Sequence, residues 1–88
     1  MYPSVKNVQA LEGHRLLLGF DNGEQRVFDV TPLLSRGRFC ELTSPFVFGS
    51  VRVSFDTVEW ENGLDIDPEV LYEQSIAHPV SVSGEPKN

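Results

Sequence analysis

The sequence predicts a small α+β domain: a small antiparallel sheet, made of a three-strand meander plus two or three short strands, with a C-terminal helix packed on it. Three observations support this fold class. Apolar and polar residues alternate over several short runs, Asn-Gly pairs at residues 22–23 and 62–63 mark turns, and residues 67–78 change to helical spacing.

The meander occupies the first third of the chain. An extended segment over residues 5–10 precedes a run at residues 16–20 whose alternate side chains are apolar, as in a strand. Asn22-Gly23 follows this run, and Asn-Gly supplies the positive φ angles of a tight hairpin turn. We therefore expect residues 16–20 to pair antiparallel with residues 25–30.

A packed connection is predicted after the meander. Thr31 is expected to cap a short helical turn that has Pro32 at its first position, where the missing N–H costs nothing. Gly37 is expected to end this turn. Residues 38–50 carry apolar side chains without a clean period, which indicates a packed segment with one helical turn.

Two further runs alternate strictly and predict short strands with a common inward face. The side chains expected to point inward are Val51, Val53, Phe55, Val58 and Trp60. Asn62-Gly63 then predicts a second turn, after which residues 64–67 alternate once more.

The helix has three agreeing start signals. Asp67 is a capping residue, Pro68 suits the first helical position, and Glu69 places an acid at the positive end of the helix dipole. We expect the helix to end at His78, because the residue before a proline disfavours helix. The side chains predicted to face the sheet are Leu71, Tyr72, Ser75 and Ile76, and those predicted to face outward are Glu69, Glu73 and Gln74.

The chain of 88 residues has the size of one domain. We expect residues 1–78 to form a single α+β domain. Residues 79–88 contain Gly84 and Pro86 and few large apolar side chains, which predicts a flexible C-terminal tail.

Other sequence features bear on cellular location. Cys40 is the single cysteine, so no disulfide can form within the chain, and residues 1–6 lack the basic and apolar parts of a signal peptide. The longest uncharged run, residues 42–51, is far shorter than the roughly 20 apolar residues of a membrane-spanning helix. We expect a cytoplasmic protein that does not cross a membrane.

Charge is distributed unevenly along the chain. The formal net charge is −6, and residues 53–86 contain no Lys or Arg. The acidic residues of that segment are Asp56, Glu59, Glu61, Asp65, Asp67, Glu69, Glu73 and Glu85. Such a segment attracts a basic partner and opposes direct binding of nucleic acid. The one basic cluster that could contact phosphates is Arg36-Gly37-Arg38, with Arg26 and Arg52 as candidate neighbours.

No residue pattern indicates an enzyme. His14 and His78 have local structural explanations, and Cys40, in an apolar stretch, is expected to be buried with no base beside it. The alternating acids of residues 65–69 could offer oxygen ligands to a metal, but a helix cap explains Asp67 better. We therefore assign no catalytic, cofactor-binding or metal-binding residues.

Several strings combine residue types that no periodicity dictates. They are Phe20-Asp21-Asn22-Gly23, Asp29-Val30-Thr31-Pro32-Leu33-Leu34, Gly37-x-Phe39-x-x-Leu42, Phe48-x-x-Val51 and Val53-x-Phe55-Asp56-Thr57-Val58-Glu59-Trp60-x-Asn62-Gly63-x-Asp65-Ile66-Asp67-Pro68-Glu69-x-Leu71-Tyr72-x-x-Ser75. Together they resemble bacterial domain-of-unknown-function family 2442 (DUF2442), and the match to this family spans nearly residues 5–76. Glu61 departs from this family, which often has a proline there, and the departure makes the turn less rigid.

The resemblance implies a small antitoxin-like α+β protein encoded beside a short toxin-like partner. It supplies no established catalytic residues. It marks a family signature made of Trp60, Asn62, Gly63, Asp65, Pro68, Leu71 and Tyr72. The resemblance and the turn and cap signals together assign the first five of these to fixing the turn and the helix entry.

These observations lead to a functional expectation. We expect a non-enzymatic protein-interaction domain, the antitoxin-like partner of a small basic toxin-like protein. The residues expected to bind this partner are Glu59, Glu61, Asp65, Glu69 and Glu73. The alternative is a small-molecule-sensing or transcription-associated regulatory module with a pocket near Trp60 and Tyr72. The unpaired edges of a small sheet also leave open a homodimer.

Overall fold

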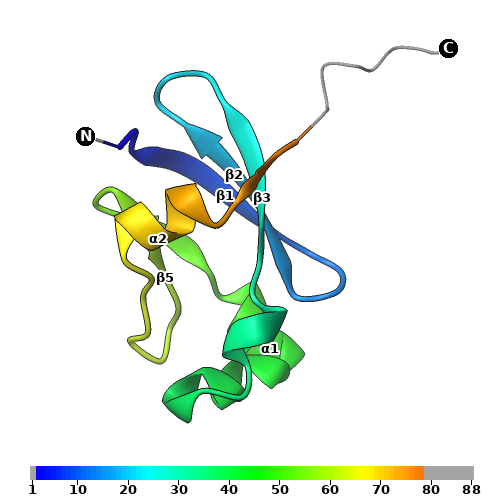
Figure 1. Ribbon diagram of the computed structural model, residues 1–88. Helices are drawn as coiled ribbons and strands as arrows, with labels where there is room; N and C mark the ends of the chain where they lie inside the picture. Colours follow the sequence, from blue (N-terminus) through cyan, green and yellow to red (C-terminus); the bar gives the residue numbers. More distant parts are fainter. Residues whose placement is uncertain (1, 79–88) are drawn as a thin grey trace, which may run out of the picture.

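The computed structural model describes residues 2–78, which form two antiparallel sheets and a set of short helices around one core (Figure 1). The four-stranded sheet has the order β1-β2-β3-β6, and β4 and β5 form a two-stranded sheet. The strands are β1 (Val5–Leu11), β2 (Arg15–Phe20), β3 (Gln25–Asp29), β4 (Arg52–Ser54), β5 (Thr57–Glu59) and β6 (Ile76–Ala77). The helices are the 3-10 segments η1 (Thr31–Leu33) and η2 (Gly37–Thr43) and the α-helices α1 (Pro45–Gly49) and α2 (Pro68–Glu73). The α+β fold class is confirmed.

The predicted meander is confirmed in strand order and direction. Leu18 pairs with Val8 of β1, and Leu16 pairs with Phe28 of β3, so the alternate apolar residues of β2 face the core. The β1–β2 register shifts between Val5 and Asn7, which leaves one extra residue in β1 at that point.

The turn between β2 and β3 differs in detail from the expected one. Gly23 has a φ of +90°, while Asn22 is not among the residues with positive φ. The N–H of Gly23 donates to the Phe20 carbonyl at 3.0 Å, and the N–H of Phe20 donates to the Glu24 carbonyl at 2.9 Å. This is a three-residue loop that needs positive φ at the glycine only.

The connection between the sheets is more helical than the single turn expected. Val30 precedes η1, so Thr31 is the first helical residue and not the predicted cap. The N–H of Thr31 is itself capped, because it donates to Asp29 Oδ1 at 2.9 Å. Gly37 begins η2 instead of ending a helix, with a φ of +51°. Cys40 is exposed, so its predicted burial is wrong: η2 turns this side chain away from the core.

The run from Val51 to Trp60 contains a hairpin that the alternation concealed. Ser54 pairs with Thr57, so Phe55 and Asp56 form a two-residue turn between β4 and β5. Phe55 has a φ of +56° and is 98% exposed, so its predicted inward orientation is wrong. Alternation assigns faces only while the chain stays extended, and a turn residue leaves the pleat.

The start of α2 is confirmed and its end is not. Asp67 Oδ1 accepts the N–H of Glu69 at 2.9 Å, as expected of a cap. The helix ends at Glu73, and Ile76 pairs with Val27 of β3 and is 73% exposed, so its predicted burial is wrong. The chain leaves the helix because the open edge of β3 offers backbone partners there.

His78 directly follows β6 and does not mark the end of α2, contrary to the prediction. Its N–H donates to the Gln25 carbonyl at 2.8 Å. The predicted tail at residues 79–88 lies outside the described residues.

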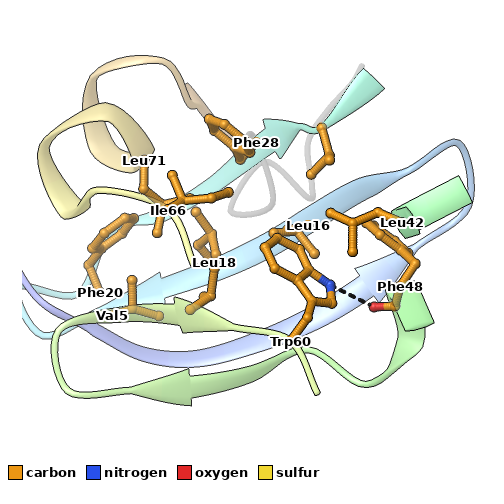
Figure 2. Close-up of a cluster of buried hydrophobic side chains, with 12 residues drawn as sticks. Val5, Leu16, Leu18, Phe20, Phe28, Leu42, Phe48, Trp60, Ile66 and Leu71 are labelled. Atoms are coloured by element: carbon orange, nitrogen blue, oxygen red, sulfur yellow. Dashed lines mark hydrogen bonds between the residues drawn. The ribbon is translucent and has the colours of Figure 1, made fainter. Parts of the chain in front are cut away.

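The core lies between the two sheets and α2 (Figure 2). Its buried residues are Val5, Leu16, Leu18, Phe20, Phe28, Val30, Leu42, Phe48, Val58, Trp60, Ile66 and Leu71. Trp60 is fully enclosed, and its indole Nε1–H donates to the Phe48 carbonyl at 3.0 Å. This hydrogen bond links the beginning of the Asn62-Gly63 turn to α1, and it gives the buried indole N–H its partner.

Candidate functional site

The carboxylates expected to bind a partner fall into two groups on consecutive elements. Glu59 at the end of β5 lies opposite Asp65 in an isolated antiparallel bridge, and Glu61 lies in the turn between them. Glu69 and Glu73 are four residues apart on α2, so they share one face of the helix. The structure thus places Glu59, Glu61 and Asp65 around one turn, and Glu69 and Glu73 on the helix that follows it.

The α2 carboxylates act on a tyrosine from the other end of the chain. The Tyr2 hydroxyl donates to Glu73 Oε2 at 2.8 Å. This hydrogen bond, followed by partial burial and the charge of Glu69, raises the pKa of Tyr2 to about 12. The hydrogen bond to Glu73 thus chiefly holds the Tyr2 hydroxyl in its protonated, donating form.

Glu59 differs from the other four carboxylates because a cation already compensates it. The ion pairs within residues 2–78 join Arg26 to Glu24 at 3.1 Å, Arg38 to Glu41 at 3.5 Å and Arg52 to Glu59 at 3.6 Å. Four of the five candidate partner-binding carboxylates take part in none of these ion pairs, namely Glu61, Asp65, Glu69 and Glu73, here called the free carboxylates. All four are exposed.

Three of the four arginines of the candidate basic cluster form ion pairs. Arg26 on β3, Arg38 on η2 and Arg52 on β4 each engage a different carboxylate. Arg38 also donates to the Asn62 carbonyl at 2.7 Å. Most of the positive charge that a nucleic-acid site would need is thus already paired within the domain.

The signature residues shape the turn and its attachments. Asn62 Oδ1 accepts the N–H of Leu64 at 3.1 Å, and Asn62 Nδ2 donates to Glu41 Oε1 at 2.7 Å. This bond, ahead of the one from Arg38, holds the pKa of Glu41 below its usual value. Gly63 supplies the positive φ of +88°. The turn is consequently tied to η2 by side-chain contacts.

Tyr72 is the centre of a cluster that the sequence did not indicate. Its hydroxyl donates to Glu24 at 3.0 Å, the Arg26 guanidinium lies 4.4 Å from its ring centroid, and its ring meets Phe20 edge-on at 5.2 Å. The bond to Glu24 raises the pKa of Tyr72 and lowers that of Glu24. Arg26 also donates to Ser75 Oγ at 2.6 Å. Only the packing of α2 beside β3 brings these residues together, since 48 positions separate Glu24 from Tyr72.

Three hollows on the surface of residues 2–78 are lined by residues other than Trp60 and Tyr72, and Trp60 has no exposed surface. Within residues 2–78 no three His, Cys, Asp or Glu side chains gather closely enough to hold a metal ion. Over the same residues, no helix has the length and apolar character needed to cross a membrane.

A comparison with protein families gives one match. The model of the family described as "Protein of unknown function (DUF2442)" matches residues 5–77. The chain belongs to this family. The DUF2442 match begins at the first residue of β1 and ends at the last residue of β6, so it coincides with the folded unit described above. No curated protein and no solved structure matched the chain in the corresponding searches.

Proposed function

We propose that this DUF2442 protein is a non-enzymatic, antitoxin-like interaction domain of the cytoplasm that binds a small basic partner protein through the free carboxylates. The observation that carries the proposal is the absence of compensation: Glu61, Asp65, Glu69 and Glu73 form none of the ion pairs within residues 2–78. Uncompensated carboxylates speed association with a positively charged surface and favour it over an acidic one.

The geometry also suits a binding surface. Asp67 caps α2, and the second turn is fastened to η2 through Asn62 and Glu41, so the elements carrying the free carboxylates are held before a partner arrives. A preorganised surface loses little conformational entropy on binding.

The first experiment is affinity purification of the tagged protein from its own cells at low salt, followed by mass spectrometry and a salt wash. We expect a small basic protein in stoichiometric amount that is released as salt rises, because salt screens exposed charges. Recovery of the domain alone would contradict the proposal.

Charge reversal then locates the binding surface. Glu61→Lys is expected to slow association with the captured partner severalfold and to flatten its salt dependence. The matched control is Glu12→Lys, which changes the net charge equally but lies in the exposed turn between β1 and β2. Equal effects of the two variants would show that net charge alone matters, and would contradict the proposed surface.

A further inference from the structure

The turn between β4 and β5 presents the most exposed large apolar side chain described for the protein. Phe55 is 98% exposed, and its backbone has a φ of +56°. Phenylalanine is rare in this left-handed region, which glycine and asparagine tolerate far better. The tight turn accounts for the positive φ, but it gains nothing from an aromatic side chain that lies almost wholly in water. The exposed ring is therefore a candidate contact for a partner.

A hollow of about 700 Å³ lies directly beside this ring. Val5 and Val53 are its aliphatic lining residues, with Val5 almost wholly buried, at 2% exposed, and Val53 partly exposed. The turn that carries Phe55 is fastened to the hollow, because the N–H of Val5 donates to the Asp56 carbonyl at 3.3 Å. Figure 1 shows the same juxtaposition, with the tip of the β4–β5 hairpin next to the beginning of β1. A projecting ring and a partly apolar recess thus form one rigid surface.

The charges around the hollow have opposite signs. Its remaining lining residues are Ser4, Lys6, Asp21 and Asp56. Lys6 is the extra residue of β1 at the register shift between Val5 and Asn7, so a bulge re-aims its side chain. Neither Lys6 nor Asp56 takes part in an ion pair within residues 2–78, although both line the same hollow.

We propose that this surface is the interface of a symmetric homodimer, in which Phe55 of each copy enters the hollow of the other. A two-fold interface joins a patch to its own copy, so the patch must be self-complementary in shape and charge. The Phe55 ring and the hollow meet the first requirement. Lys6 and Asp56 meet the second, because the two-fold axis places the lysine of one copy opposite the aspartate of the other.

The net charge of −6 disfavours self-association through a surface that has carboxylates and no cation, as on the segment with the free carboxylates. The hollow has two carboxylates, Asp21 and Asp56, but it also offers an apolar anchor and the cation of Lys6, and none of the free carboxylates lines it. The dimer therefore leaves the proposed partner-binding surface available and does not depend on it.

Sedimentation equilibrium of the full chain over a series of concentrations tests the dimer. We expect a reversible monomer–dimer equilibrium for the wild type. Phe55→Asn should weaken association by about tenfold or more, because a central aromatic anchor carries much of the binding energy of an interface. Asparagine tolerates the positive φ, so circular dichroism should show an unchanged fold.

Phe46→Asn is the matched control, because Phe46 is 88% exposed on α1 and does not line the hollow. It should leave the association constant unchanged. A wild type that stays monomeric up to its solubility limit would overturn the proposal, and would point to a different protein as the occupant of the hollow. Equal losses in the two phenylalanine variants would also overturn it, since general stickiness would then explain association.

A charge swap tests the two-fold arrangement. Lys6→Glu should weaken the dimer, because it places like charges opposite each other. Adding Asp56→Lys should restore association, and the main-chain bond from Val5 to residue 56 does not involve the exchanged side chain. A double variant that associates no better than Lys6→Glu would overturn the proposed pairing.

Discussion

The two Asn-Gly turns share one backbone design but depend differently on the rest of the molecule. In each, the glycine N–H donates to the carbonyl three residues earlier, at 3.0 Å in the first turn and 2.9 Å in the second. The asparagine Oδ1 accepts the N–H two residues later, from Glu24 at 3.0 Å and from Leu64 at 3.1 Å. The two glycines have φ values of +90° and +88°. The local sequence therefore sets the turn itself.

The difference lies in what the asparagine amide contacts. Asn22 Nδ2 donates to Glu24, two residues away, whereas Asn62 Nδ2 donates to Glu41, which is 21 residues away. The first turn joins two fully paired strands, and the second is followed by a single bridge between Glu59 and Asp65. The second turn therefore has few strand–strand hydrogen bonds beside it, and side-chain contacts with η2 hold it in place.

The largest expected effect comes from the aromatic residue that opens the second turn. Trp60→Ala should destabilise the domain by about 3–5 kcal/mol, because it empties a fully buried site. In a domain this small, thermal and urea denaturation should show little folded protein at ambient temperature.

Trp60→Phe separates the hydrogen bond from the packing. It keeps an aromatic ring but leaves the Phe48 carbonyl without its donor, at an expected cost of about 1–3 kcal/mol. A cost as large as that of Trp60→Ala would show that shape, not the hydrogen bond, decides the fit.

Replacing the asparagine of each turn should give the next largest loss of stability, and it tests the comparison between the two turns directly. Asn62→Ala should cost about 2 kcal/mol and Asn22→Ala about 1 kcal/mol, because Asn62 also loses its long-range bond to Glu41. The measurement is the free energy of unfolding in urea for both variants. Equal values would mean that the second turn is as self-sufficient as the first.

The smallest effect is a pH dependence that both turns share. Hydrogen bonds, chiefly from Tyr72 to Glu24 and from Asn62 to Glu41, lower the pKa of both carboxyls from 4.5. Each carboxylate therefore adds stability that is present above pH 4.5 and is lost as the pH falls through its lowered pKa. The contribution is modest, because both side chains are more than a third exposed, at 39% and 44%.

The check is urea denaturation of Glu24→Gln and Glu41→Gln at neutral pH and well below pH 4.5. Each variant should be less stable than the wild type at neutral pH and should approach it in acid. A difference that persists in acid would assign the effect to packing rather than to charge.

The parts of this protein that depend on neighbouring residues follow from the amino-acid sequence alone. The three-strand meander, both glycine turns and the Asp67 cap follow from residues within a few positions of each other, and all are present. The acidic character of residues 53–86 is also evident from the sequence, since no Lys or Arg occurs there, whereas the ion pair of Glu59 with Arg52 is a contact of the folded protein.

Tertiary contacts, by contrast, set where short helices and strands end and which distant side chains meet. Phe55 continues an alternating pattern but lies in a turn, and Ile76 continues a helical pattern but joins the edge of β3. The bond from Asn62 to Glu41 and the cluster around Tyr72 likewise bring distant residues together. The spacing of apolar residues predicts which face a side chain occupies only within a regular helix or strand. Where such an element ends depends on contacts with residues far along the chain.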